Sequence, residues 1–395
     1  MATNIVPYNI AFPPSEVNEL KQRLLNARFP GLAGENNWDR GPPIRDIRRL
    51  ATHWRESFNF SQFEEKLNQL NNYEATVSVD GFDPFQLHFI HHKSAAADAI
   101  PLLFIHGWPG SFIEVTKILP LLAKSDPAFH VIAPSLPNYG FSGLTPKPGF
   151  GIKQYAEACL KLMQGLGYEK FATQGGDWGS IISRTMGVLY PESVLALHLN
   201  LVMASAPTDV DPADAARVQE QHKNWMETGD GYYKIQRQRP NTIGIALADS
   251  PVGLLTWIYD KLVAWTDEYP WTDDEVCEWL SIYWFSRAGP AASVTIYHEV
   301  FRGEFNLGAG IYPPRNSLIG FSYFPKEIMC TPSSWNKQLG DVVFERKHER
   351  GGHFAAWEKP EDLVGDLRDM FARGGRAYAA FQAKQASGHR RDVSL

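Results

Sequence analysis

Short apolar runs alternate with amphipathic segments over the first half of the chain. Residues 102–105 are continuously apolar and residues 130–133 nearly so, as in strands buried on both faces. At 113–122 and 152–166 the apolar positions recur instead at the spacing of a helix. Alternating strands and helices predict an α/β fold with a mostly parallel, doubly wound sheet.

The N-terminal residues follow a different pattern. Residues 73–79 and 85–90 each alternate in strand fashion, and Asp80-Gly81 between them supplies a turn, which predicts a β-hairpin. Ahead of the hairpin, residues 15–25, 44–58 and 61–70 are predicted to be helices, with a Gly/Pro/Asn-rich excursion at 31–43. The first of these helices begins at a candidate N-cap, Ser15. This N-terminal meander holds no convergent set of catalytic residue types. We expect it to pack against the core and to be a candidate part of a dimer surface.

The strand pattern disappears between residues 206 and 297. This segment is helical and rich in aromatic residues: Trp225, Tyr232, Tyr233, Trp257, Trp265, Trp271, Trp279 and Trp284. Strand patterns return at 317–324 and 342–345, and a closing helix is predicted from residue 360 to about 373. The expected units are the meander with the first hairpin (1–92), the first part of the core (93–205), a helical lid (206–297) and the second part of the core (298–395).

Composition narrows the classes of function. Hydrophobic residues make up 44% of the chain and charged residues 21%, which is ordinary for a globular protein with an ample core. The net charge of −6 gives no basic footprint for a nucleic acid. With 12 Trp, 15 Tyr and 23 Phe, the chain is well supplied for a large apolar pocket. We therefore expect a small apolar molecule as partner.

We recognise no targeting signal in the sequence. The first nine residues lack a basic region before an apolar run, and no stretch approaches the length of about 20 apolar residues that a membrane span needs. The three cysteines, Cys159, Cys277 and Cys330, are widely separated and suggest neither a disulfide framework nor a metal cluster. A cytoplasmic protein without a membrane anchor is the expectation.

One stretch, Gly175-Gly-Asp-Trp-Gly179, lies between a short apolar run and a helical pattern. Gly-x-Asp-x-Gly in that setting matches the nucleophile elbow of α/β-hydrolases, with a carboxylate where serine is usual. The flanking glycines allow close backbone approach while Asp177 is held strained and exposed. The alternative is a glycine turn in which Asp177 merely caps the helix.

Further candidates fall where predicted strands end, which is where catalytic groups gather in an open parallel sheet. They are His106, Glu327 and His353. The order of nucleophile, acid and histidine along the chain fits this class of hydrolase, with His353 as the base. His106 is expected to be structural, shaping the loop whose backbone N–H donates at Trp108.

The chain resembles the microsomal-type epoxide hydrolases, especially the soluble fungal members, over nearly its whole length. The motifs that carry the resemblance are His106-Gly-Trp-Pro-Gly-Ser111, Gly175-Gly-Asp-Trp-Gly179, Pro240-Asn-Thr-Ile-Gly244 with Asp249-Ser-Pro-Val-Gly253, and Gly351-Gly-His-Phe-Ala-Ala356. Two departures are visible. The transmembrane helix of the animal members has no counterpart, and the loop at residues 137–142 differs around Tyr139.

The resemblance implies roles for particular residues. Glu327, in Phe-Pro-Lys-Glu, would be the acid that orients the histidine, ahead of Asp341, Glu345 and Glu349, which compete for that role. Two lid tyrosines would open the epoxide ring; the local pattern places them at Tyr232 and Tyr297. Tyr233 is an alternative to Tyr232, since a slip of one residue exchanges them. The family also implies a homodimer.

The chemistry explains why aspartate replaces serine. A serine that attacked an epoxide carbon would form an ether, whereas a carboxylate forms an ester that water can hydrolyse. His353 would activate that water, and the backbone N–H groups of Trp108 and Trp178 would form the oxyanion hole. His106, Pro109 and Tyr139 are expected along the substrate pocket. This mechanism needs no metal and no organic cofactor.

Two other functions remain possible from the residues. A haloalkane or haloacid dehalogenase also uses an aspartate nucleophile, but it needs halide-binding groups and would leave two lid tyrosines idle. A non-catalytic protein could hold an apolar ligand under the lid. The presence of aspartate, histidine and acid in workable order argues against such a binding protein.

Overall fold

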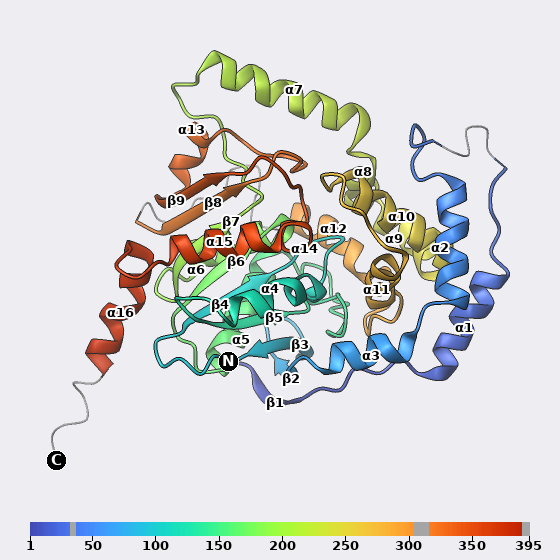
Figure 1. The fold of residues 1–395 in the computed structure, drawn as a ribbon, viewed down its shortest axis with the longest axis horizontal. Coiled ribbons are helices and arrows are strands. Elements are labelled where there is room, and N and C mark those ends of the chain that lie inside the picture. The colour runs from blue at the N-terminus through green and yellow to red at the C-terminus, as the bar shows by residue number, and fades with distance from the viewer. Residues whose placement is uncertain (32–36, 304–315, 389–395) are drawn as a thin grey trace.

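The computed structural model describes residues 1–31, 37–303 and 316–388, with side chains up to residue 382. A nine-stranded sheet runs through this described part in the order β1-β2-β3-β5-β4-β6-β7-β8-β9 (Figure 1). The strands are β1 (Thr3–Pro7), β2 (Asn72–Val77), β3 (Phe85–His92), β4 (Ile100–Ile105), β5 (Phe129–Pro134), β6 (Phe171–Gly175), β7 (Val194–Leu199), β8 (Leu318–Tyr323) and β9 (Asp341–Lys347).

The sheet is mostly parallel, as the pattern predicts. Strands β5, β4, β6, β7, β8 and β9 run parallel, whereas β1, β2 and β3 form an antiparallel edge that joins β5. The predicted hairpin is β2 with β3, and the edge strand β1 was not predicted. The chain leaves β4 and β6 in opposite directions across the sheet, so their carboxyl ends form the switch point where ligands bind in such folds.

Helices cover both faces of the sheet. On the near face in Figure 1, α4 (Val115–Leu122) packs against α14 (Ala355–Glu358) and α15 (Pro360–Met370). Behind the sheet, α5 (Ile152–Gly165) packs against α6 (Asp177–Leu189). The short turns η1 (Phe112–Glu114), α13 (Ser333–Asn336) and η4 (Lys337–Leu339), and the last helix α16 (Arg376–Gly388), complete the core.

A helical insertion separates β7 from β8. It comprises α7 (Pro212–Thr228), α8 (Gly231–Gln238), α9 (Pro240–Asp249), α10 (Pro251–Ala264), α11 (Asp273–Trp284), η2 (Ala292–Val294) and α12 (Thr295–Arg302). Because α12 continues to Arg302, the insertion extends past the expected end at residue 297. Helix α7 has no buried residue and lies along the outer edge of the molecule in Figure 1. Residues 304–315 and 389–395 of the expected second core unit lie outside the described residues.

The N-terminal helices are α1 (Pro14–Leu25), α2 (Ile44–Glu56) and α3 (Phe60–Asn68). The expected N-cap at Ser15 is wrong: Pro13 precedes the helix, Pro14 occupies its first turn, and no side chain caps it. Proline suits that position because its fixed φ is helical and it has no N–H to satisfy.

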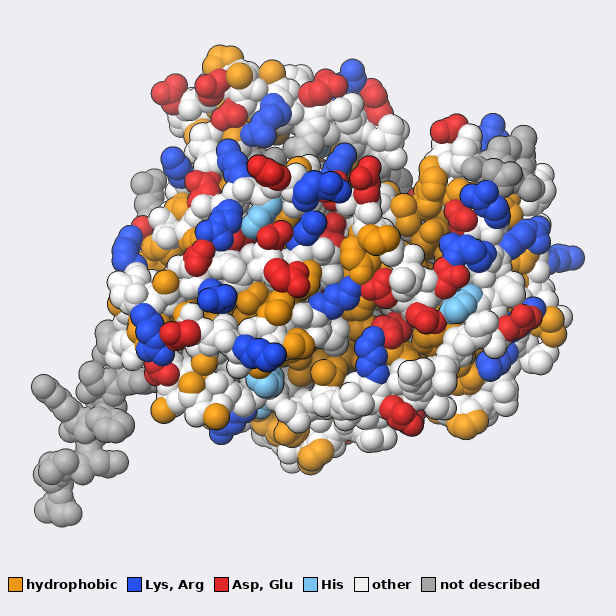
Figure 2. Space-filling view, in the orientation of Figure 1, with side chains coloured by type: hydrophobic (Ala, Val, Ile, Leu, Met, Phe, Trp, Pro, Cys, Tyr) orange, Lys and Arg blue, Asp and Glu red, His pale blue; other side chains and the backbone are white. Residues whose placement is uncertain are grey.

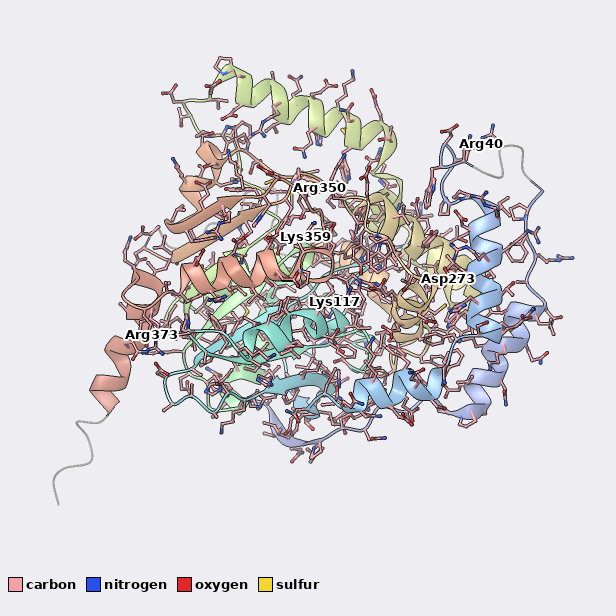
Figure 3. The ribbon with its side chains drawn as sticks, in the orientation of Figure 1. Arg40, Lys117, Asp273, Arg350, Lys359 and Arg373 are labelled. Carbon is pink, nitrogen blue, oxygen red and sulfur yellow. The ribbon has the colours of Figure 1, made fainter. Side chains whose placement is uncertain are left out.

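The N-terminal helices hold the lid. The fully buried Trp54 of α2 donates its indole N–H to Ser281 Oγ in α11 at 3.1 Å. Lys66 Nζ lies 2.7 Å from Glu278 Oε1, and Arg49 pairs with Asp273, which Figure 3 labels where α11 meets α2. The apolar face of α2 is therefore covered within the monomer.

The surface carries charges of both signs. Figure 2 shows Lys and Arg interspersed with Asp and Glu over the visible face, without a large area of one sign. In the part of the chain that the structure describes, no single helix is long and apolar enough to cross a membrane. Helices α9 and α10 have the length and composition together, but the chain bends by 116° between them.

Candidate active site

Asp177 occupies a tight elbow between β6 and α6. Its φ is +48°, in the left-handed region that non-glycine residues rarely adopt. The glycines on either side permit the turn: a Cβ on Gly175 would lie 2.4 Å from the backbone of Gly179, and one on Gly179 would lie 1.8 Å from Ile105 O. Any side chain at these two positions would push the elbow away from β4.

The side chain of Asp177 does not cap helix α6. Gly176 is the N-cap residue, and no side chain bonds to the first turn. Asp177 Oδ1 instead accepts the backbone N–H of Trp108, in the loop after β4, at 2.7 Å. The capping alternative is therefore wrong, and the carboxylate points across the switch point of the sheet.

The loop after β4 is shaped by His106. Its Nδ1 donates to the carbonyl oxygen of Gly107 at 3.0 Å, and its Nε2 accepts the N–H of Leu136 at 3.1 Å. Burial lowers the pKa of His106 to about 4, so the ring is neutral and fixed in one tautomer. A Cβ on Gly107 would lie 2.0 Å from Asp177 Oδ1, so only glycine lets this loop approach the carboxylate.

His353 lies between two carboxylates. Its Nδ1 is 2.5 Å from Glu327 Oε1, and its Nε2 is 3.5 Å from Asp177 Oδ2. Burial alone would lower the pKa of His353, but the charges and hydrogen bonds of Glu327 and Asp177 outweigh it and raise the pKa well above its ordinary value. Asp177, Glu327 and His353, predicted from three separate motifs, are thus brought together.

The loop that carries His353 is bound to the lid. The N–H of His353 donates to the carbonyl oxygen of Trp265 at 2.8 Å, and the N–H of Gly351 donates to Asp267 Oδ2 at 2.9 Å. Arg350, labelled in Figure 3, reaches the same carboxylate with its Nε at 2.6 Å. The position of the histidine therefore depends on the segment that follows α10.

Tyr232 and Tyr297 meet over Trp108. The ring of Tyr232 stacks on Trp108 with centroids 5.4 Å apart, and the ring of Tyr297 meets Trp108 edge-on at 5.7 Å. Both tyrosines are buried, and burial together with the charge of Asp177 raises the pKa of each above its ordinary value. Among the described residues, none bonds the buried hydroxyl of Tyr297. Both phenols remain proton donors at neutral pH.

Tyr233 has a different environment from Tyr232. It is only half-buried, it packs between Trp225 and Phe301, and its hydroxyl lies 3.4 Å from Arg237 Nη1. Tyr232 is buried against Trp108 and Trp265, and Lys261 Nζ lies 5.1 Å from the centroid of its ring. This geometry favours Tyr232 as the partner of Tyr297.

A pocket of about 420 Å³ opens beside Asp177, within the size range of sites for small ligands. Apart from Asp177, Arg184, Ser205 and His222, its lining is apolar or aromatic: Trp178, Ile181, Leu201, Met203, Ala204, Trp225, Tyr232, Tyr233, Tyr297, Phe301, Ile328 and Met329. The expected lining residues His106, Pro109 and Tyr139 are not among them. His106 and Pro109 belong to the loop after β4; His106 lines a smaller cavity beside Asp177, and Tyr139 meets the ring of His106 at 5.1 Å.

Trp178 has a place in both the turn and the pocket. It follows Asp177 in the first turn of α6, where backbone N–H groups have no partner within the helix. Its ring lies 4.9 Å from that of Tyr297. The expected oxyanion donor and one wall of the pocket therefore belong to the same residue.

Sequence reasoning missed Glu114, at the end of η1. Burial raises its pKa to about 8, and it lines a second cavity, of about 20 Å³, together with Asp177 and His353. The pattern Ser111-x-x-Glu114 is that of a capping box, so the sequence did hold a signal for it. Within the described residues, no group of three His, Cys, Asp or Glu side chains is placed to hold a metal ion.

Comparison with known families agrees with this architecture. Residues 5–115 match the family model "Epoxide hydrolase N terminus", and residues 100–239 match "alpha/beta hydrolase fold". The first match spans the N-terminal helices and the loop after β4, and the second contains the elbow. Together they cover Trp108, Asp177 and Tyr232 of the site, whereas Tyr297, Glu327 and His353 lie beyond them.

Individual relatives extend the likeness over almost the whole chain. Epoxide hydrolase 1 of Sus scrofa is 32% identical over 411 residues, covering 92% of this chain and 88% of that protein. The structure of Aspergillus niger epoxide hydrolase is 31% identical, with a TM-score of 0.81 over 93% of this chain and 96% of that one. The juvenile hormone epoxide hydrolase of the silkworm Bombyx mori is 28% identical, with a TM-score of 0.85 over 97% and 96%.

Proposed function

The chain belongs to the epoxide hydrolase family, and from that premise we propose that it converts an epoxide and water to a vicinal diol through an ester on Asp177. One observation carries the proposal. The Asp177 carboxylate is hydrogen-bonded to the N–H of Trp108 on one oxygen and faces His353 on the other, at the edge of a pocket that holds two buried phenols.

In the first step, Asp177 attacks an epoxide carbon from the side opposite the C–O bond that breaks. Tyr232 and Tyr297 hydrogen-bond to the epoxide oxygen, and one of them gives it a proton. A phenol suits this task because an alkoxide is far more basic than a phenolate. The closeness of the two rings to Trp108 supports a common target for both hydroxyls.

The first step also changes the histidine. While Asp177 is a carboxylate, it helps to raise the pKa of His353 and so keeps the ring protonated. Conversion of Asp177 to a neutral ester removes that contribution, and the pKa of His353 falls. His353 can then release its proton and become the general base that the second step requires. Esterification thus prepares the base.

In the second step, water attacks the carbonyl carbon of Asp177 and gives a proton to His353 Nε2. Glu327 holds the other ring nitrogen and stabilises the imidazolium. The oxyanion develops on the side-chain oxygen beside the N–H of Trp108, with Trp178 as the second donor; one such donor contributes about 3 kcal/mol. Collapse of the intermediate expels the diol and restores the carboxylate.

The substrate that fits is an apolar epoxide of modest size. The pocket of about 420 Å³ is lined mainly by aromatic and aliphatic side chains, so it favours a hydrocarbon or aryl substituent next to the ring. The dehalogenase alternative is not favoured, because it gives the two buried phenols no task. On the resemblance to soluble fungal enzymes we also propose a cytoplasmic location and a homodimer.

A single turnover in ¹⁸O-water tests the ester mechanism. Excess protein is mixed with styrene oxide, and the diol and the peptide that contains Asp177 are analysed by mass. Because water attacks the carbonyl carbon of Asp177, the label is expected in the aspartate and not in the diol. Label in the first-turnover diol would mean that water attacks the epoxide directly.

A further inference from the structure

Glu114 folds back into the loop that carries the oxyanion donor. Its Oε1 accepts the N–H of Ser111 at 3.1 Å, and Ser111 in turn caps η1. The absence of a side chain at Gly110 makes room for the carboxyl, because a Cβ there would lie 2.0 Å from Oε1. One carboxyl oxygen is therefore used by the capping box. Within the described residues, no hydrogen bond is made by the other, Oε2.

The carboxyl of Glu114 lines a cavity of about 20 Å³. A space of this size holds about one water molecule, provided that two or more polar groups surround it. Glu114, Asp177 and His353 all line it, and so does Gln174, whose buried Oε1 has no partner among the described residues. The cavity thus has the polar lining that a bound water requires.

The two cavities share one carboxylate, that of Asp177. Asp177 lines both the large apolar pocket and the small polar cavity, whereas His353 and Glu114 line only the small one. An epoxide in the large pocket and a water in the small cavity would therefore each reach Asp177 without displacing the other. Water could be stored during the first step and used in the second.

We propose that Glu114 is a catalytic residue of the second step, holding the hydrolytic water against His353 and the carbonyl carbon of Asp177. The water donates one O–H to His353 Nε2 and accepts the O–H of neutral Glu114 at Oε2 on one lone pair, so that its other lone pair faces the ester. A C–O bond forms at Asp177, the proton passes to His353, and the ester C–O bond then breaks. The departing alkoxide of the diol takes that proton back from His353, and the new carboxylic acid of Asp177 then protonates the ring again, which restores the carboxylate.

Glu114 suits this task because it is neutral. Burial raises its pKa to about 8, and the charge of Asp177 raises it too, while the charge of His353 opposes the shift. The other titratable groups near it are Tyr283, a buried phenol, and His106, which is neutral. A second carboxylate beside His353 would keep the ring protonated, whereas a neutral carboxyl donates its O–H to the water and leaves the base free.

The inference rests on the proposed function, and the two chemical steps allow it to be tested separately. Styrene oxide is mixed with excess protein, and formation and decay of the ester on Asp177 are followed by quenched-flow mass analysis. The Glu114→Met variant keeps the volume of the side chain but removes its oxygens. We expect ester formation within about threefold of wild type and ester decay slowed at least about thirtyfold. Glu114→Gln, which retains a donor in place of the acid O–H, should restore most of the decay rate.

Ser111→Ala is the matched control, because it removes the other half of the capping box and leaves the carboxyl of Glu114 at the cavity. In Ser111→Ala, the ratio of the rate of ester formation to the rate of ester decay should equal that of the wild type. If Glu114→Met slows both steps alike, or neither, Glu114 is a capping residue only. Should Glu114→Met fail to fold, Gly110→Ala displaces the carboxyl and must give the same selective loss; an unchanged ratio overturns the role. A wild-type protein that forms no ester would overturn the proposed function itself.

Discussion

The indole N–H of Trp279, in lid helix α11, donates to the carbonyl oxygen of Pro109 at 2.6 Å. Pro109 follows Trp108, so this bond joins the lid to the loop that supplies an oxyanion donor. The neighbouring Tyr283 makes a second such bond, from its hydroxyl to Gly110 O at 2.7 Å. Helix α11 therefore fixes the loop through bonds from the lid, and His106 fixes it through bonds within the core.

Trp279→Phe should loosen this loop. The variant leaves the buried carbonyl of Pro109 without a donor, which costs about 1–3 kcal/mol, and it frees the N–H of Trp108 to move away from Asp177. We expect a lower melting temperature and a lower kcat/KM for styrene oxide. Trp271→Phe is the control, because Trp271 donates to Leu262 O within the lid and not to the loop. Equal loss of activity in both variants would contradict the link.

Asp177→Ala should abolish diol formation. No other carboxylate at the site can form the ester, since Glu327 faces Nδ1 of His353 and Glu114 is held by Ser111. Diol is measured by gas chromatography after prolonged incubation with styrene oxide, and the circular dichroism spectrum reports on folding. Turnover near that of the wild type would refute the nucleophile.

His353→Gln should stop the reaction after the first step. Ring opening needs Asp177 and the tyrosines, whereas hydrolysis needs a base, so the ester should accumulate. The expected observation is an intact protein mass increased by one molecule of epoxide. An unmodified protein in the presence of substrate would argue against the role of the histidine as base.

Replacing each tyrosine by phenylalanine should show whether Tyr232 or Tyr233 acts with Tyr297 on the epoxide oxygen. Tyr297→Phe and Tyr232→Phe are each expected to slow ester formation by about 10²-fold, because each removes a donor to the epoxide oxygen. Tyr233→Phe serves as the matched variant in the same helix and should change the rate by less than about threefold, since its hydroxyl lies beside Arg237. A large loss in Tyr233→Phe with little loss in Tyr232→Phe would exchange their roles.

Three buried histidines make the fold sensitive to acid. Burial lowers the pKa of His88 to about 3 and those of His106 and His198 to about 4. Their unfolded pKa is about 6.5, so the stability that they contribute is present above that pH and falls as the pH drops towards the folded values. Each costs up to about 1.4 kcal/mol per pH unit. Urea denaturation between pH 7 and pH 5 should show this slope; a flat profile would contradict it.

Local motifs predicted which candidate residues lie together better than they predicted the pocket around them. Asp177, Glu327 and His353 lie in short motifs at strand ends, and a parallel sheet brings such ends together whatever the loops do. The substrate pocket depends instead on how α7 and α12 return across the sheet, which no local pattern encodes. That is why Trp225 and Phe301 were missed as pocket residues while Pro109 and Tyr139 were expected there.

Glu114 is a single residue whose local structure, but not its place in the site, could be predicted from the sequence. Its sequence pattern indicates a capping box, and the structure contains that box. Whether the carboxyl also faces Asp177 depends on the close approach of η1 to the elbow, which the glycines at 107 and 110 permit. The dimer surface expected on the N-terminal helices stays a prediction, and the face of α2 that carries Trp54 is covered by the lid.

The hydrogen bonds between the lid segment and the loop that carries His353 restrict which lid movements could admit substrate or release product. A hinge that lifted α10 would break the contact of Trp265 with His353 and that of Asp267 with Gly351, and so would move the base with every turnover. Helix α7 has no buried residue and takes part in neither contact. Departure of the diol along α7 would therefore leave intact the bonds that position His353.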